Sequence, residues 1–176
     1  LRSDLTAPIA RVVTSLLKDE PLPLRLAYHA NVFRAIEEEA GRDAEFFQSG
    51  VELIGDASAE ADAEIVALAI ETLQAAGIEE SKIALGHVGF LNGLFRDALP
   101  NDNEVQESLK SYLLRRNYVG YTELVEQLAV SNEAKAELLG VLRLHGGTEI
   151  CRQARLLTQD AEAGAAIDHL CKVFEV

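Results

Sequence analysis

Three polar side chains, Arg34, Gln48 and Glu52, stand where two extended segments could bring a guanidinium, an amide and a carboxylate together. Gln48 and Glu52 are four residues apart, so the two-residue period of a β-strand places both on one face. A carboxylate binds an ammonium group and a guanidinium binds a carboxylate, so the set suits a zwitterion such as an amino acid. The same residues also fit a solvated sheet face with an ordinary Arg–Glu cross-strand pair.

The segments that carry these side chains have the pattern of an antiparallel hairpin. Residues Pro23–Phe33 and Glu45–Ile54 are predicted strands, and the polar segment Glu37–Asp43, with a glycine at its bend, is the predicted tip. Before the hairpin, Thr6–Leu17 has apolar residues at helical spacing and a proline near its start, which favours a helix.

The rest of the chain is mostly helical in pattern. Residues 56–76 form an amphipathic repeat with Ser58 as the expected cap, and Lys82–Val88 is a predicted short strand. Further helices are predicted at Glu104–Arg116, Thr122–Leu128, Asn132–Leu144, Thr148–Leu157 and Ala161–Val176. The predicted fold class is therefore α+β, with a mixed part over residues 1–90 and a small all-helical subdomain over residues 91–176.

Charge and composition exclude several classes of partner. The chain has 176 residues and a formal charge of −13, which argues against a nucleic acid or an anionic membrane surface as partner. No apolar run approaches the roughly 18 residues that span a bilayer, and no signal peptide is apparent at the start. The two cysteines, Cys151 and Cys171, fit free thiols in a reducing cytoplasm, and Cys171 lies in an apolar helical stripe typical of core packing.

The common catalytic signatures are absent from the sequence. It has no phosphate-binding glycine loop of the P-loop or dinucleotide type and no nucleophile elbow. The four histidines are scattered, and no cysteine pair has zinc-site spacing. We therefore expect no catalytic residue, no metal and no cofactor. The chain also lacks methionine and ends inside a helical pattern, so we expect it to be the middle of a longer protein.

Two stretches resemble a known family. Phe33-Arg34, Gly41-Arg42 and the segment Glu45–Gly55 resemble motif 2 of the histidyl-tRNA synthetase family, and Leu1–Thr6 resembles the L-R-P-[DE]-x-T segment that precedes it there. The resemblance implies part of the antiparallel sheet of a class II aminoacyl-tRNA synthetase, with flanking helices. Motif 1, the family's dimer interface, has no counterpart in this sequence, so self-association would use residues outside it.

The resemblance also implies a ligand. The positions at which these synthetases contact L-histidine are occupied here by Asp4, Thr6, Arg34, Gln48 and Glu52, all of suitable chemistry. Arg42 matches a position for contact with a phosphate or another anion.

The tip of the hairpin departs from the synthetase pattern. The glutamate that would hold the adenine amino group is Ile36, which cannot accept a hydrogen bond, and the basic residue after it is Glu37. The last arginine of the pattern is Ala44. An acidic tip repels both a triphosphate and RNA. Loss of the ATP loop with retention of the amino-acid face resembles the family's inactive branch, the regulatory subunits of short-form ATP phosphoribosyltransferase.

Three functions are compared on these grounds. The resemblance favours a cytoplasmic, non-catalytic regulatory subunit that binds L-histidine and joins a short-form ATP phosphoribosyltransferase catalytic subunit in the first step of histidine biosynthesis. The alternative is a histidyl-tRNA synthetase with a degenerate motif 2. The third is a pseudo-synthetase or structural module that docks through Tyr118–Tyr121, although such an aromatic pair more often packs at a helix junction.

Overall fold

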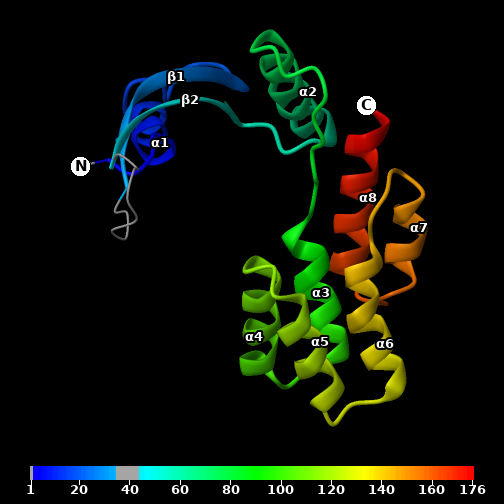
Figure 1. The fold of residues 1–176 in the computed structure, drawn as a ribbon. Helices are drawn as coiled ribbons and strands as arrows, with labels where there is room; N and C mark the ends of the chain where they lie inside the picture. Colours follow the sequence, from blue (N-terminus) through cyan, green and yellow to red (C-terminus); the bar gives the residue numbers. More distant parts are fainter. Residues whose placement is uncertain (1, 35–43) are drawn as a thin grey trace. The chain divides into compact units, whose positions relative to one another are not determined.

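The computed structural model describes residues 2–34 and 44–176, which divide into two compact units, Leu1–Thr72 and Leu73–Val176. The elements begin with α1 (Thr6–Ser15), β1 (Leu24–Phe33), β2 (Glu45–Ile54) and α2 (Ala59–Ala75), whose last residues belong to the second unit. The second unit continues with α3 (Val88–Ala98), α4 (Asn103–Leu114), α5 (Tyr118–Gln127), α6 (Asn132–Gly140), the 3-10 turn η1 (Val141–Arg143), α7 (Ile150–Arg155) and α8 (Ala161–Glu175) (Figure 1).

The first unit is built on the predicted hairpin. Strands β1 and β2 pair antiparallel over ten residues each, from Leu24 opposite Ile54 to Phe33 opposite Glu45. Exposure alternates along both strands, so one face of the hairpin is more covered than the other. Val32, on the covered face, is completely buried. The two predicted strands and their antiparallel pairing are confirmed, with β1 starting one residue later than expected, and the predicted tip Glu37–Asp43 lies outside the described residues.

Helix α2 is tied to the opposite, more exposed face of β1. The Arg25 guanidinium donates two hydrogen bonds to the Glu64 carboxylate, at 2.5 and 2.7 Å. Ser58 caps the helix as predicted, since its Oγ accepts from the Ala61 N–H at 3.2 Å. The amphipathic repeat over residues 56–76 predicts a buried apolar face, but Leu68, one of its apolar residues, remains 40% exposed.

The second unit holds the main hydrophobic core. Helix α3 packs against α8 and α6, and α4 packs against α5. The largest fully buried side chains of this unit are Tyr121, Phe95, Leu94, Leu109, Leu138 and Val125. The Tyr121 hydroxyl donates to the Leu138 carbonyl at 2.9 Å, which satisfies its one buried polar group. Burial raises the pKa of Tyr121 because the phenolate would have to be desolvated.

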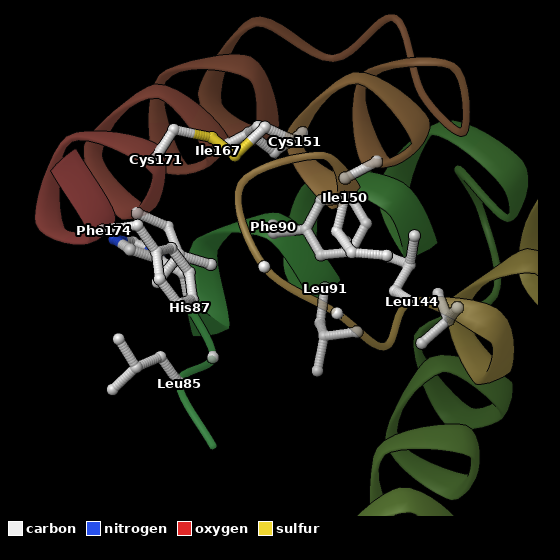
Figure 2. A pocket seen from close by; sticks show the side chains of 16 residues that line it. Leu85, His87, Phe90, Leu91, Leu144, Ile150, Cys151, Ile167, Cys171 and Phe174 are labelled. Atoms are coloured by element: carbon white, nitrogen blue, oxygen red, sulfur yellow. A yellow bond between two sulfur atoms is a disulfide. The ribbon is translucent and has the colours of Figure 1, made fainter. Parts of the chain in front are cut away.

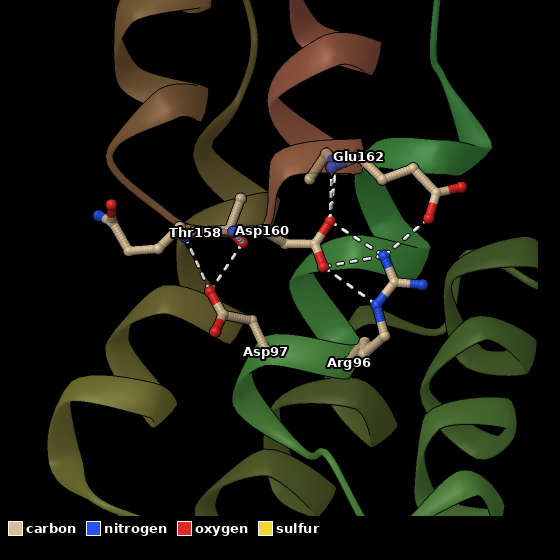
Figure 3. A network of polar contacts seen from close by, with 7 residues as sticks. Arg96, Asp97, Thr158, Asp160 and Glu162 are labelled. Atoms are coloured by element: carbon tan, nitrogen blue, oxygen red, sulfur yellow. Dashed lines mark hydrogen bonds and ion pairs between the residues drawn. The ribbon is translucent and has the colours of Figure 1, made fainter.

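A polar network joins the end of α3 to the start of α8 (Figure 3). Asp160 is the N-cap of α8, and Arg96 of α3 donates to both of its carboxylate oxygens. Asp97 accepts a hydrogen bond from the Thr158 hydroxyl at 2.9 Å. The backbone N–H of Ala163, followed by Arg96, lowers the pKa of Asp160 because both stabilise the carboxylate. The network therefore fixes the entry of α8 against α3.

Several predictions of secondary structure are wrong. Residues 82–87 of the predicted strand Lys82–Val88 have no regular structure, because a strand needs a partner and the sheet of the described residues contains only β1 and β2, and Val88 begins α3 instead. Helix α3 follows directly, with the His87 Nδ1 accepting from the Gly89 N–H at 3.1 Å as a cap. Helix α5 starts at Tyr118, four residues before the predicted start at Thr122.

The expectation of free thiols is also wrong. Cys151 of α7 and Cys171 of α8 form a disulfide, with their Cα atoms 6.1 Å apart. Their separation of 20 positions in the sequence gave no sign that α7 folds back against α8. Packing of Cys171 against the core is confirmed, since both sulfurs lie beside the main hydrophobic cluster. Of the helices in the described part of the chain, none is long and apolar enough to cross a membrane.

Candidate functional site

The hairpin register places the predicted binding residues in a row on one face. Gln48 lies opposite Ala30 and Glu52 lies opposite Leu26, two pairs of the same parity, so both side chains project from the covered face. They are four residues apart, which corresponds to about 13 Å along the strand. The predicted shared face of Gln48 and Glu52 is confirmed.

The N-terminal segment crosses this face and is held at both of its ends. At one end Arg2 donates from Nε to the Asn31 carbonyl at 2.6 Å, and its own carbonyl accepts from the Phe33 N–H at 2.8 Å. At the other end the Thr6 hydroxyl donates to the Glu52 carboxylate at 2.7 Å. The structure therefore brings Thr6, the first residue of α1, into direct contact with Glu52.

Asp4 lies between these two anchors and is half-buried. The helix that follows uses no side chain as its N-cap, because Leu5 occupies the cap position and is itself buried. The Thr6 hydroxyl is therefore not used for capping and remains available to Glu52. Arg2, which fixes the whole segment, was not predicted as part of the site, although it belongs to the opening motif of the sequence.

Gln48 has an unmet hydrogen-bonding capacity. Its Oε1 is buried and has no hydrogen-bond partner among the described residues. A buried amide oxygen without a donor costs free energy comparable to a lost hydrogen bond, and most such atoms in proteins are satisfied. A ligand that supplies an N–H donor in the middle of the row would satisfy it.

Tyr28 fills the gap between Gln48 and Glu52. It lies opposite Gly50 in the register, on the same covered face. A Cβ added at Gly50 would overlap the Tyr28 ring, so only glycine lets the ring lie flat against β2. The aromatic ring thus forms the floor between the two polar side chains. Sequence reasoning missed Tyr28, although the opposition of a tyrosine and a glycine across a hairpin could have indicated it.

Arg34 lies at the far end of the row. Its backbone N–H donates to the Ala44 carbonyl at 2.9 Å, and its guanidinium carbon lies 5.2 Å from the centroid of the Phe46 ring. Phe46 is two residues from Gln48 on the same face, so the guanidinium is directed back toward the middle of the row.

The register excludes the cross-strand Arg34–Glu52 pair that was the alternative interpretation of this face. Eight β2 positions separate Glu52 from Ala44, which is about 26 Å along the strand and beyond the reach of two side chains. The order along the face is a cation, an amide and a carboxylate. The face therefore has a positive end at Arg34 and a negative end at Glu52. The predicted anion contact, Arg42, lies outside the described residues, as do Ile36 and Glu37.

The helical unit contains a separate apolar cavity of about 230 Å³ (Figure 2). Its lining includes the Cys151–Cys171 disulfide, Phe90 and Phe174, together with the ring of His87, and no Asp, Glu, Lys or Arg side chain. None of the residues in the polar row lines it. Among residues 2–34 and 44–176, no three His, Cys, Asp or Glu side chains converge in a way that could hold a metal ion.

The family model described as Histidyl-tRNA synthetase matches the chain over residues 1–176. The chain belongs to the histidyl-tRNA synthetase family. The predicted fold class, a mixed synthetase-like part followed by helices, is thereby confirmed.

Several curated relatives of this chain share one name within this family. Proteins named ATP phosphoribosyltransferase regulatory subunit are 47% identical in Halalkalibacterium halodurans and 46% identical in Bacillus subtilis, in both cases over the whole of this chain. The chain spans 44% and 45% of the length of these two relatives.

Solved structures agree with this placement. The crystal structure of an ATP phosphoribosyltransferase regulatory subunit/histidyl-tRNA synthetase from Bacillus halodurans C matches with a TM-score of 0.93 and 46% identity, over 99% of this chain and 45% of that one. The structure of a histidine–tRNA ligase subunit from Alicyclobacillus acidocaldarius matches less closely, with a TM-score of 0.76 and 27% identity, over 99% of this chain and 54% of that one.

Proposed function

We propose that this chain is part of a non-catalytic regulatory subunit of a short-form ATP phosphoribosyltransferase and that the row on its hairpin binds L-histidine. The catalytic partner would condense ATP with phosphoribosyl pyrophosphate, a glycosyl transfer that begins histidine biosynthesis in the cytoplasm. The observation that carries the proposal is the row itself, in which Thr6 donates to Glu52 and the Gln48 amide oxygen lacks a donor.

The chemistry of histidine fits the row. Its ammonium and imidazole groups supply N–H donors for Glu52 and for the empty Gln48 Oε1. The guanidinium of Arg34 lies too far along the row for one histidine to contact it together with Glu52, so it would attract the carboxylate through its charge. The Tyr28 ring would offer an apolar floor to the imidazole. Asp4, half-buried between the anchors of the N-terminal segment, adds a second carboxylate for the ammonium group.

A regulatory role is favoured over aminoacylation by the hairpin tip and by the relatives. Ile36 and Glu37 stand where a synthetase would hold adenine and the triphosphate, and neither offers the required acceptor or positive charge. Relatives that match the whole of this chain at 46–47% identity carry the name of the regulatory subunit. Self-association of the protein would use the family's motif 1, which is not in this sequence.

Feedback inhibition requires that histidine binds the inhibited arrangement of the complex more tightly than the active one. The coupling free energy for such regulation is typically about 1–3 kcal/mol. A row that is only half satisfied in the absence of ligand is suited to this role, because ligand binding adds hydrogen bonds that one arrangement can complete and the other cannot.

An exchange assay separates the two branches of the family. The full-length protein is incubated with ATP, labelled pyrophosphate and L-histidine, and in parallel its affinity for L-histidine is measured by calorimetry. We expect histidine binding without histidine-dependent ATP–pyrophosphate exchange. Exchange at a rate usual for a synthetase would overturn the proposal in favour of aminoacylation, and absence of histidine binding would overturn the assignment of the row.

A further inference from the structure

Helix α7 depends on its neighbours for its structure. It has six residues, Ile150–Arg155, and among them Ala154 alone is buried. The five residues before it, 145–149, are all exposed. A helix this short is unstable in water by itself, so α7 persists only through its contacts with other elements.

A disulfide and an ion pair tie α7 to α8. The disulfide joins Cys151 to Cys171, and the ion pair joins Arg155 to Asp168. The two side chains of the ion pair are 48% and 51% exposed, and pairs so exposed contribute little because water screens them. A covalent cross-link between residues 20 positions apart stabilises a fold much more. The disulfide is therefore the stronger of the two ties.

The chain on either side of α7 allows it to move without the rest of the helical unit. After α7, the Thr158 hydroxyl donates to the Asp97 carboxylate at 2.9 Å and holds the chain against α3. Before α7, Gly146 has φ of 148°, a backbone conformation that favours glycine. Residues 147–157, which we call the α7 segment, can therefore separate from α8 while the packing of α3 on α8 stays in place.

The disulfide borders the apolar cavity of the helical unit (Figure 2). Cys151 and Cys171 both line this cavity, and both residues are partly exposed, so a thiol in solution can approach the sulfur atoms. Ile150 and Ala154 of α7 line the cavity as well. Helix α7 thus forms one wall of the cavity, and its departure would open the cavity to water.

We propose that the Cys151–Cys171 disulfide is a reversible latch that holds α7 against α8, and that its reduction by a dithiol releases the α7 segment. One sulfur of the dithiol attacks the disulfide, forms a mixed disulfide with one cysteine and displaces the other as a thiolate. The second sulfur of the dithiol then closes a disulfide within the reductant and displaces the remaining cysteine. Two electrons pass from the dithiol to the protein, and the two protons that the dithiol releases end on Cys151 and Cys171.

The location of the protein favours a reversible bond. The proposed function sets the protein in the cytoplasm, where disulfides are usually transient or redox-sensing. The latch itself rests on the contacts of α7 and needs neither histidine nor a catalytic partner.

The test is hydrogen exchange of the full-length protein, followed by mass spectrometry, with and without dithiothreitol. We expect the hydrogen-bonded backbone N–H groups of residues 150–157 to exchange at least about tenfold faster after reduction, since the α7 segment then opens locally. Exchange in α4 should stay the same. Replacing dithiothreitol with oxidised glutathione should restore slow exchange in α7.

Two variants separate the disulfide from the ion pair. Asp168→Asn removes the ion pair and keeps the disulfide, so exchange in α7 should stay within about twofold of the oxidised, unmodified protein. Cys151→Ser combined with Cys171→Ser keeps the ion pair, and α7 should then exchange fast whether or not dithiothreitol is present. Added salt should speed exchange in the reduced protein more than in the oxidised one, because the Arg155–Asp168 pair is then the stronger remaining tie.

Three results would overturn the latch. Equal exchange in the oxidised and reduced protein would mean that other contacts hold α7. Faster exchange in both α4 and α7 would mean that reduction unfolds the whole helical unit. A disulfide that dithiothreitol leaves intact in the folded protein would exclude a reversible bond. Each of these results leaves the proposed function untouched, because that function is tested by histidine binding and by ATP–pyrophosphate exchange.

Discussion

Glu52 offers a sharp test of the binding row because its charge can be removed without removing its contact. In Glu52→Gln the side-chain oxygen can still accept the Thr6 hydroxyl that now bonds to it at 2.7 Å, so α1 keeps its attachment to the hairpin. A hydrogen bond to a charged group contributes about 1.5–3 kcal/mol, against about 1 kcal/mol for a neutral one. A loss of about 1.5 kcal/mol corresponds to a roughly tenfold weaker affinity for L-histidine.

The assay is calorimetric titration of L-histidine into the full-length protein and its Glu52→Gln variant. The control is Thr6→Val, which removes the Thr6–Glu52 hydrogen bond and leaves the charge of Glu52 in place. We expect a smaller loss for Thr6→Val, about fivefold, because the hydrogen bond removed orients the carboxylate while the charge of Glu52 remains. Glu52→Gln with an affinity within twofold of the unmodified protein would refute the reasoning.

Three further predictions concern the helical unit. Replacing Cys151 and Cys171 with serine should lower the free energy of unfolding by about 3 kcal/mol, the value for a closed loop of this length, as measured by urea titration under oxidising conditions. Tyr121→Phe should cost about 1–2 kcal/mol in the same titration, because the Leu138 carbonyl loses a buried donor. The pKa of Asp160 is lowered in the fold, so its contribution is present above its unfolded pKa of about 3.9 and is lost as the pH falls below it. Asp160→Asn should therefore flatten the fall in Tm between about pH 5 and pH 2, and an unchanged pH profile would contradict this role.

The hairpin could be predicted from the sequence because the residue pattern of each segment indicates the same two strands that pair in the structure. The strands were bounded by a polar segment, and the two-residue period alone was enough to place Gln48 and Glu52 on one face. Tyr28 could not be predicted as part of the site, because its ring lies between Gln48 and Glu52 only when the register places it opposite Gly50. Register follows from the pairing of two strands and not from either strand alone.

The helical unit was harder to predict because tertiary contacts outweigh local preference there. Helix α3 contains Gly89 and Gly93, and glycine lowers the intrinsic preference of a segment for a helix. Tertiary packing explains Gly93, because a Cβ at this position would overlap Ala163 of α8, so only glycine allows α3 to pack closely on α8. The disulfide between Cys151 and Cys171 depends in the same way on the packing of α7 against α8, which no local sequence pattern indicates.

We propose that the hairpin row makes the full-length protein a histidine-responsive regulator of a catalytic partner. The most direct measurement is phosphoribosyl-ATP formation by the full-length protein mixed with a short-form ATP phosphoribosyltransferase catalytic subunit from the same source, with and without L-histidine. We predict activity that appears on mixing and falls when L-histidine is added, with less inhibition for Glu52→Gln at the same concentration. Activity that does not depend on this protein, or that is unchanged by L-histidine, would contradict the account.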